Sequence, residues 1–289
     1  MTSTTSHWFP SIAKSTNPDS RSQSLALPWQ TLPMVSVYRT VTLAILLSLL
    51  WKSSYYPMVW QAYRQLELVD GFFPTPFRSA TVLAGLILLA MASIVIGWLP
   101  FARRALPLLA GLLTACMAGM CWHQGTYNDV TFLTGFWAAA WCTWLACSLH
   151  QPREQVLARG QRLAVLIVSL MFLGGALGKW TPGYWSGEVL YQIYFVDRDF
   201  WFFNLLRGWL DTESLRAFAT GYSRMVVVVE SLGAGLWLLP VRWAGAIGML
   251  TLLGIIVFSN FYLFSVMFSL LGLCLVAMLP TPAGGTPER

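Results

Sequence analysis

Apolar stretches long enough to cross a membrane recur from one end of this chain to the other. Hydrophobic residues make up 56% of its 289 residues and charged residues only 10%, and the mean hydropathy is +0.60. Because about 20 apolar residues in a helix cross the hydrocarbon core of a bilayer, this composition predicts an all-α polytopic membrane helix bundle of about eight spans. The apolar runs cover residues 35–51, 79–99, 108–122, 130–149, 163–180, 222–239, 243–258 and 264–279.

The segments around these runs divide the chain into three predicted regions. Residues 1–33 are rich in Ser and Thr without hydrophobic periodicity, which indicates a disordered cytoplasmic tail. Residues 34–280 form the predicted transmembrane domain, and 281–289 a flexible C-terminal tail. Within the domain, the sequence DFWFFNLLRGWL at 199–210 is typical of an extracytoplasmic helix that lies in the membrane interface.

The distribution of arginine predicts the orientation. Arginines occur in the loops at 103–104, 153–162 and 242, whereas the short loops around Asp129 and Asn260 contain no Lys or Arg. By the positive-inside rule, the arginine-bearing loops and both termini are cytoplasmic. We therefore expect an integral protein of a bacterial inner (plasma) membrane.

The first outer loop runs against this pattern, because it carries Lys52, Arg64 and Arg78. The net charge of +6 does not indicate nucleic-acid binding, since the basic residues are spread over several loops. The expected partners are membrane lipids, with an exported peptide or a membrane complex, and no nucleic acid.

The stretch 170–187, LMFLGGALGKWTPGYWSG, places a lysine at the end of a glycine-rich apolar helix. Gly174 and Gly178 form a G-x-x-x-G pattern, which predicts close approach of a neighbouring membrane helix. Lys179 follows where hydrocarbon gives way to headgroups. One interpretation is that it extends to the headgroups within an aromatic belt. The other is that it has a tunable pKa and acts as a base.

Glu230 is an acid inside a predicted span, directly after four valines. Such residues indicate a functional group with a partner, or a neutral glutamic acid that only joins two helices by a hydrogen bond. Since the segment between the fifth and sixth spans returns to the same side, we predict that Lys179 and Glu230 share one polar cluster. Asn128 and Asn260 are expected to bridge the gap between them.

Other familiar site patterns are missing from the sequence. The five cysteines form no C-x-x-C and are expected to be small core residues. No H-E-x-x-H, P-loop or dinucleotide fingerprint occurs, so no metal site is predicted. His123, at a helix end, is expected to be an interfacial side chain.

The order of these features resembles the HTTM family of membrane proteins, which includes the vitamin K-dependent gamma-glutamyl carboxylase. A lysine after a glycine-rich helix is followed by W-x-x-G-x-W-x-G at 180–187 and then by Glu230. The resemblance extends over about 39–279. Further matching features are Arg39 at the start of the first span, Tyr127-Asn128-Asp129 before the fourth, and NFYLFSVMF at 260–268 after the seventh.

The resemblance implies that Lys179 is a base acting on a reduced quinone on the extracytoplasmic side. It also implies a quinone or quinol as cofactor. We assign the cofactor contacts to Trp180 and Trp185. The other candidate catalytic residues are Glu230, Asn128, Asp129 and Asn260.

The chain departs from the family's pattern at two histidine positions. Asp129 takes the place of one histidine, and Phe258-Ser259-Asn260 occupies the region of the other. The soluble domain that binds the carboxylase's protein substrate is not among these residues. We therefore expect quinone- or redox-linked modification of an exported peptide, and not gamma-carboxylation itself.

Three alternatives to an enzyme of this kind were weighed on the sequence. The main one is a non-catalytic subunit of a membrane complex, in which Lys179 and Glu230 only hold helices together. A small DoxX-like quinone-associated protein is disfavoured because that group has fewer spans. A transporter is disfavoured because the chain shows no internal repeat and a single deep acid.

Overall fold

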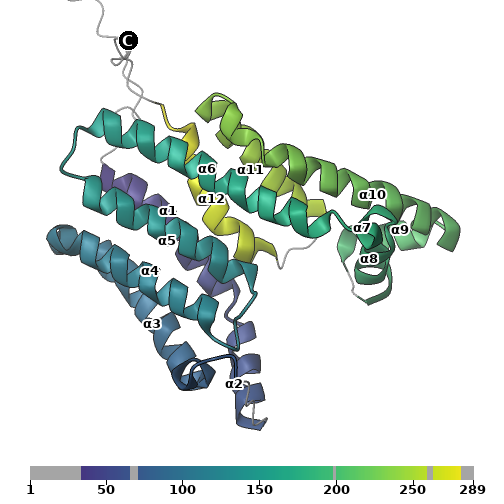
Figure 1. Cartoon of the computed structure of the whole chain (residues 1–289), viewed down its shortest axis with the longest axis horizontal. Helices are drawn as coiled ribbons and strands as arrows, with labels where there is room; N and C mark the ends of the chain where they lie inside the picture. The colour runs from purple at the N-terminus through teal and green to yellow at the C-terminus, as the bar shows by residue number, and fades with distance from the viewer. Residues whose placement is uncertain (1–33, 66–70, 198–199, 259–262, 281–289) are drawn as a thin grey trace, which may run out of the picture.

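The computed structural model describes residues 34–65, 71–197, 200–258 and 263–280, and these residues form helices and turns without any strand (Figure 1). The predicted tails at 1–33 and 281–289 lie outside this part. The longer helices are α1 (Met34–Trp51), α3 (Ala80–Gly97), α4 (Leu106–Trp122), α5 (Val130–Ser148), α6 (Arg153–Lys179), α10 (Thr212–Gly233), α11 (Val241–Phe258) and α12 (Phe264–Met278). The shorter elements are α2 (Tyr55–Gln65), η3 (Thr75–Arg78), η4 (Pro100–Ala105), α7 (Pro182–Trp185), α8 (Glu188–Tyr191), η5 (Gln192–Asp197), α9 (Trp201–Trp209) and η6 (Leu236–Leu238).

Six of the described helices are long and apolar enough to span a membrane, namely α1, α3, α4 with its leading turn, α5, α6 and α11. The apolar α12 has 15 residues. The prediction of an all-α polytopic membrane bundle is thus confirmed, and the protein is a multi-pass membrane protein. Since every backbone N–H and C=O must find a partner in hydrocarbon, a chain of this composition forms helices there.

The predicted sixth span at 222–239 differs from the structure. The helix α10 begins earlier, at Thr212, because the Asp211 side chain accepts a hydrogen bond from the Ser214 N–H at 2.8 Å and caps it. It ends at Gly233, and the rest of the predicted span is a turn followed by η6. Two glycines within three residues, Gly233 and Gly235, weaken a helix at this point.

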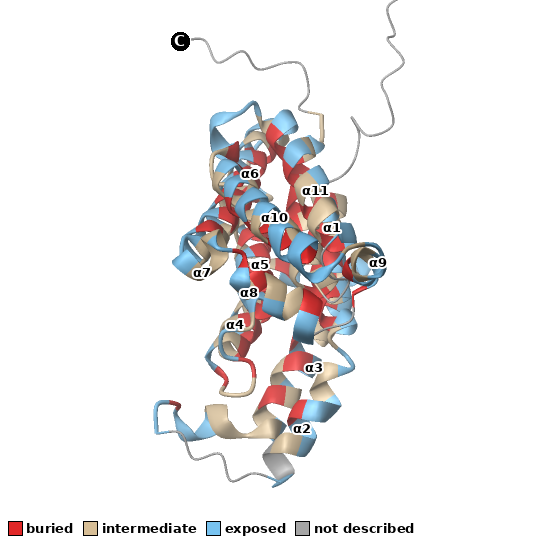
Figure 2. Cartoon of the chain, turned by 90° about the vertical axis from the view of Figure 1, so that its right-hand side faces the viewer, coloured by how far each residue is buried: buried red, intermediate tan, exposed pale blue. Residues whose placement is uncertain are grey.

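The main core lies between the spanning helices. Figure 2 shows buried positions concentrated on the helix faces that point into the bundle. Two glycines let neighbouring helices pack closely. An added Cβ at Gly272 would lie 2.7 Å from Ala44 Cβ, and one at Gly245 would lie 2.8 Å from Ala277 Cβ. Cys116, Cys142 and Cys274 are buried, as predicted for core residues, whereas Cys147 is exposed.

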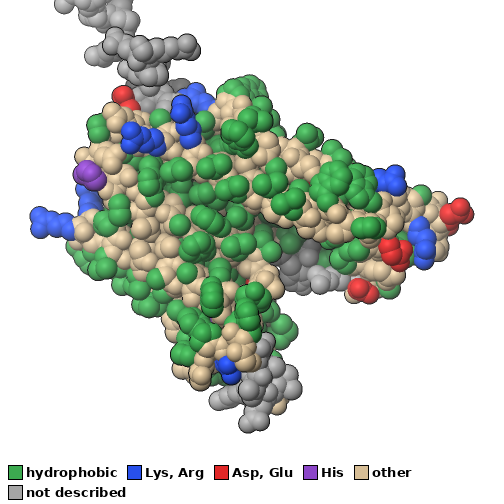
Figure 3. Space-filling model, in the orientation of Figure 1, with side chains coloured by type: hydrophobic (Ala, Val, Ile, Leu, Met, Phe, Trp, Pro, Cys, Tyr) green, Lys and Arg blue, Asp and Glu red, His purple; other side chains and the backbone are tan. Residues whose placement is uncertain are grey.

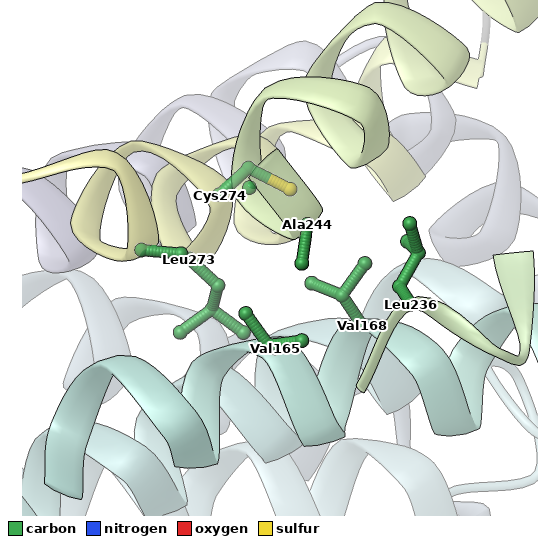
Figure 4. A pocket seen from close by; sticks show the side chains of 8 residues that line it. Val165, Val168, Leu236, Ala244, Leu273 and Cys274 are labelled. Atoms are coloured by element: carbon green, nitrogen blue, oxygen red, sulfur yellow. The ribbon is translucent and has the colours of Figure 1, made fainter. Parts of the chain in front are cut away.

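The apolar packing continues into a crevice between α6, η6, α11 and α12. Figure 4 shows Val165 and Val168 of α6 facing Leu236, Ala244, Leu273 and Cys274. The crevice is too narrow for a water molecule and is lined by apolar side chains. It is therefore a packing joint between helices.

A second, smaller core belongs to α8–α10, which extend from one end of the bundle with α7 (Figure 1). We call residues 182–222 the aromatic lobe. Its buried members are Leu190, Phe195, Phe200, Phe203, Leu215 and Ala219. The predicted interfacial helix forms α9 (Trp201–Trp209), which is amphipathic: Phe203 is buried, while Trp201, Leu205 and Trp209 lie exposed on the opposite face.

The two ends of the bundle differ in charge. The basic end, where α6 and α11 begin, carries seven arginines and one acid among the described side chains. They are Arg39, Arg103, Arg104, Arg153, Arg159, Arg162 and Arg242, with Glu154. Figure 3 shows several blue side chains gathered at the upper left. The opposite end, which includes the aromatic lobe, carries six basic and six acidic side chains. They are Lys52, Arg78, Lys179, Arg207, Arg216 and Arg224, with Asp129, Glu188, Asp197, Asp211, Glu213 and Glu230.

This charge difference predicts that the basic end faces the cytoplasm. Single cysteines placed at Arg159 and at Ser186, both exposed and on opposite ends, should label differently in a cysteine-free background. An impermeant thiol reagent added outside intact cells should modify the cysteine at 186 and not the one at 159. Labelling of the cysteine at 159 alone would show that the protein has the opposite orientation.

Candidate functional site

Lys179 and Glu230 form an ion pair between the last residue of α6 and the last turn of α10. The Lys179 Nζ lies 2.8 Å from Glu230 Oε2, and it also donates to the Gly175 carbonyl oxygen at 3.4 Å. The Lys179 side chain is 26% exposed and that of Glu230 12%. The predicted shared cluster is therefore confirmed, and the lysine turns toward the neighbouring helix instead of extending to the headgroups.

The glycine that permits this contact is Gly175. An added Cβ there would lie 2.8 Å from Glu230 Oε2, whereas a Cβ at Gly174 or Gly178 would meet nothing within 4 Å. Among the described residues, no helix approaches Gly174 and Gly178 closely, so the G-x-x-x-G prediction was wrong for them. Gly175 precedes Lys179 by four residues, so both lie on one helix face, and that face is the one that meets Glu230.

Aromatic residues surround the ion pair. Trp180 Nε1 donates to Ser231 Oγ at 3.1 Å, and the Trp180 and Trp185 rings meet edge to face at a centroid distance of 5.0 Å. The Lys179 Nζ lies 6.0 Å from the centroid of the Tyr184 ring. Burial raises the pKa of the Tyr184 phenol, and the Glu230 carboxylate raises it further, so the phenol keeps its proton at neutral pH. We call these residues, with Lys179 and Glu230, the lysine site.

The turn that follows Lys179 is fixed to α10 by hydrogen bonds to its backbone. Ser223 Oγ donates to the Tyr184 carbonyl oxygen at 2.6 Å, and Arg224 Nε donates to that of Trp185 at 3.0 Å. Gly187 has φ +79°, and an added Cβ would lie 2.5 Å from the Thr220 backbone. The last glycine of the W-x-x-G-x-W-x-G pattern is therefore required by both its conformation and this close approach.

Asn128 and Asp129 belong to a different place in the molecule. Asp129 pairs with Lys52 at the end of α1, and its Oδ1 accepts from the Thr131 N–H at 2.9 Å, which caps α5. Asn128 adopts the left-handed conformation with φ 61° and makes the turn before this cap. The basic residue Lys52, which opposed the charge pattern, is thus neutralised by Asp129.

Asn128 does not bridge Lys179 and Glu230 as predicted, and Asp129 lies with Asn128, apart from that pair. Among the described residues, no hydrogen bond or ion pair joins either of them to Lys179 or Glu230. Figure 1 places the α4–α5 connection near α2, and the end of α6 beside α7 and α10. Asn260 lies outside the described residues. In the described part of the chain, no three His, Cys, Asp or Glu side chains gather as a metal site.

His123 is fully buried, which the sequence interpretation as an interfacial side chain missed. Its Nε2 donates to the Ser79 carbonyl oxygen at 2.9 Å, and its Nδ1 accepts from the Gly125 N–H at 3.1 Å. This pattern holds the neutral imidazole, because a proton on Nδ1 would face a donor. Burial lowers the pKa of His123, and the bond to Ser79 opposes that only in part.

Comparison with protein-family models, with curated proteins and with solved structures finds no match to this chain. Any assignment of chemistry therefore depends on the residues of the lysine site. Sequence reasoning found its two charged members and its two tryptophans. It placed Tyr184 only in an aromatic belt, and it missed Ser231 and the role of Gly175. The spacing of Gly175 from Lys179 was visible in the sequence, whereas nothing marked Ser231, because only the docking of α10 brings it to Trp180.

The ion pair predicts coupling between its two members. In a double-mutant cycle with Lys179→Met and Glu230→Gln, each single change leaves a partly buried partner unpaired, and we expect a coupling energy of roughly 0.5–3 kcal/mol. The measurement is thermal or denaturant stability in detergent. Strictly additive effects would show that the pair does not form in solution.

Glycine variants provide a matched test of the same contact. Gly175→Ala should displace the Glu230 carboxylate and reduce the coupling measured in the cycle, because the new methyl group occupies its place. Gly174→Ala, one residue away and open within this chain, should leave the coupling unchanged. An equal effect of both variants would contradict the role assigned to Gly175.

The buried neutral His123 predicts a loss of stability in acid. Since its folded pKa lies below its ordinary value of about 6.5, the unfolded chain binds the proton more readily, and stability falls as the pH drops below about 6.5. His123→Gln should flatten the stability difference between about pH 7.5 and about pH 5.5. His150→Gln, which removes an exposed histidine, is the matched control, and an unchanged slope in His123→Gln would contradict the argument.

Proposed function

We propose that this protein is an HTTM-like membrane enzyme that modifies an exported peptide or an apolar substrate at the extracytoplasmic face, with Lys179 as base. The observation that carries the proposal is the asymmetry of the ion pair. The amine is the more accessible member, and the carboxylate behind it is nearly buried. This arrangement suits an amine that meets substrate and a carboxylate that receives its proton.

The proton must leave the amine before Lys179 can act as a base, because an ammonium group has no lone pair. Glu230 lies within hydrogen-bonding distance at 2.8 Å and is the acceptor for that proton. The neutral amine then takes a proton from the substrate. Tyr184, protonated at neutral pH, would supply a hydrogen-bond donor beside the pair.

A quinone or quinol at the lysine site would lie against the outer surface of the tryptophans. The edge-to-face contact of Trp180 with Trp185 leaves no slot between the two rings. Trp180 is 56% exposed and offers its outer surface to a flat ring next to the Lys179 amine. A quinol bound there would supply a weakly acidic hydroxyl group and two electrons.

A helix clamp in a non-catalytic subunit is the second candidate function. It is favoured by the additional bond from Lys179 Nζ to the Gly175 carbonyl oxygen, which holds the amine against its own helix. The bond from Trp180 to Ser231 ties the same two helices together. A clamp predicts that Lys179→Met mainly lowers stability, whereas a base predicts that it mainly abolishes turnover.

Turnover can be tested with menadiol as the probe. The purified protein in lipid nanodiscs should accelerate oxygen uptake by menadiol, because deprotonation of the hydroxyl precedes transfer of two electrons to O₂, which gives menadione and H₂O₂. Lys179→Met should reduce the acceleration by about 100-fold or more.

The matched control is Lys52→Met, which removes the lysine of the other ion pair at the same end. It should retain the acceleration. If both variants lose it equally, or the wild-type protein gives none, the proposal of a quinol-linked base is wrong. Melting temperatures of both variants separate lost chemistry from lost folding.

For gamma-carboxylation, in contrast, we predict no activity. Asp129, at one of the family's histidine positions, is engaged in capping α5 and pairing with Lys52. The protein should therefore give no carboxylated glutamate peptide with vitamin K hydroquinone and CO₂. Product above the level of a Lys179→Ala control would show that this histidine is dispensable.

A further inference from the structure

A hollow at the basic end lies between α6 and the start of α11, away from the lysine site. It has about 370 Å³ of space accessible to water and is lined by Ala158, Gln161, Arg162, Pro240, Val241, Arg242 and Trp243. This volume falls within the range of small-ligand sites. Its floor is rigid, because the buried Gln161 amide donates to the carbonyl oxygens of Val276 and Leu279 at the end of α12.

Two arginines of this hollow have no partner within the described part of the chain. Arg162 and Arg242 come from different helices, are exposed, and take part in no ion pair or hydrogen bond there. The first turn of α11 begins at the same place, since the Ala244 N–H bonds the Pro240 carbonyl oxygen at 3.0 Å. Two guanidinium groups beside a helix N-terminus form a site for an anion, and guanidinium matches phosphate in shape.

Apolar surface leads away from the hollow along α11. Trp243, at the edge of the hollow, is 68% exposed. Further along α11, Ile247, Leu250 and Leu253 are exposed at helical spacing. Trp237 and Leu238 of η6 are exposed nearby in the chain. A free anion would not need such a surface, whereas the acyl chain of a lipid would cover it.

We propose that this hollow binds the phosphate headgroup of an anionic membrane lipid, with Arg162 and Arg242 contacting the phosphate and Trp243 the acyl–glycerol boundary. Basic pockets between membrane helices are sites of this kind for anionic lipids. The site is independent of the proposed enzyme function, because it lies at the opposite end from Lys179.

The test measures the melting temperature and native mass spectrum of the detergent-purified full chain. Phosphatidylglycerol, phosphatidylcholine and inorganic phosphate are added in separate titrations. We expect stabilisation and retained lipid with phosphatidylglycerol alone. Arg162→Gln with Arg242→Gln should weaken that binding roughly thirtyfold, and lysine at both positions should restore most of it.

The matched control is Arg103→Gln with Arg104→Gln, which removes the same charge from the same end but outside the hollow. This variant should bind phosphatidylglycerol as the wild type does. Equal weakening by the two double variants would overturn the site in favour of a general charge effect. Stabilisation by inorganic phosphate alone, or equal binding of phosphatidylcholine, would overturn the anionic lipid as its occupant.

Discussion

The contact between Lys179 and Glu230 holds α10, whose first part belongs to the aromatic lobe, against the end of α6. It links the end of α6 to α10, and Gly175 makes room for the carboxylate. Around it, Ser223 and Arg224 donate to the backbone of the turn that follows α6. Since an unpaired charge near hydrocarbon is costly, this pair favours one position of α10 against α6 over others.

The two ends of the molecule differ in their charged side chains. The end with the lysine site carries balanced charge, two lysine–carboxylate pairs and a lobe whose α9 exposes an apolar face with Trp201 and Trp209. At the basic end, no described arginine has an acidic partner within the described part of the chain, and a hollow lies between two of them. The two proposals follow this separation, with chemistry proposed at the end of the lysine site and anionic lipid at the basic end.

Only the site residues that carry a charge next to apolar sequence could be paired from the sequence. A lysine closing an apolar helix and a glutamate after four valines both demand partners in hydrocarbon, so Lys179 and Glu230 could be paired from sequence. Asp129 was misplaced because a carboxylate before a helix also serves as an N-cap, and that is its role here. His123 was misjudged because the carbonyl that satisfies its buried ring belongs to Ser79, 44 residues away.

The sequence by itself determined that this is a helical membrane protein, because apolar runs in a bilayer must satisfy their backbone groups within helices. It also determined the charge difference between the ends and the amphipathic α9, since both follow from residue order alone. Only the tertiary structure decided where α10 begins and breaks, that Gly175 and not Gly174 admits the carboxylate, and that the polar residues divide into two sites. These outcomes depend on which helices touch, and contacts between residues such as Lys52 and Asp129, 77 positions apart, leave no periodic pattern in the sequence.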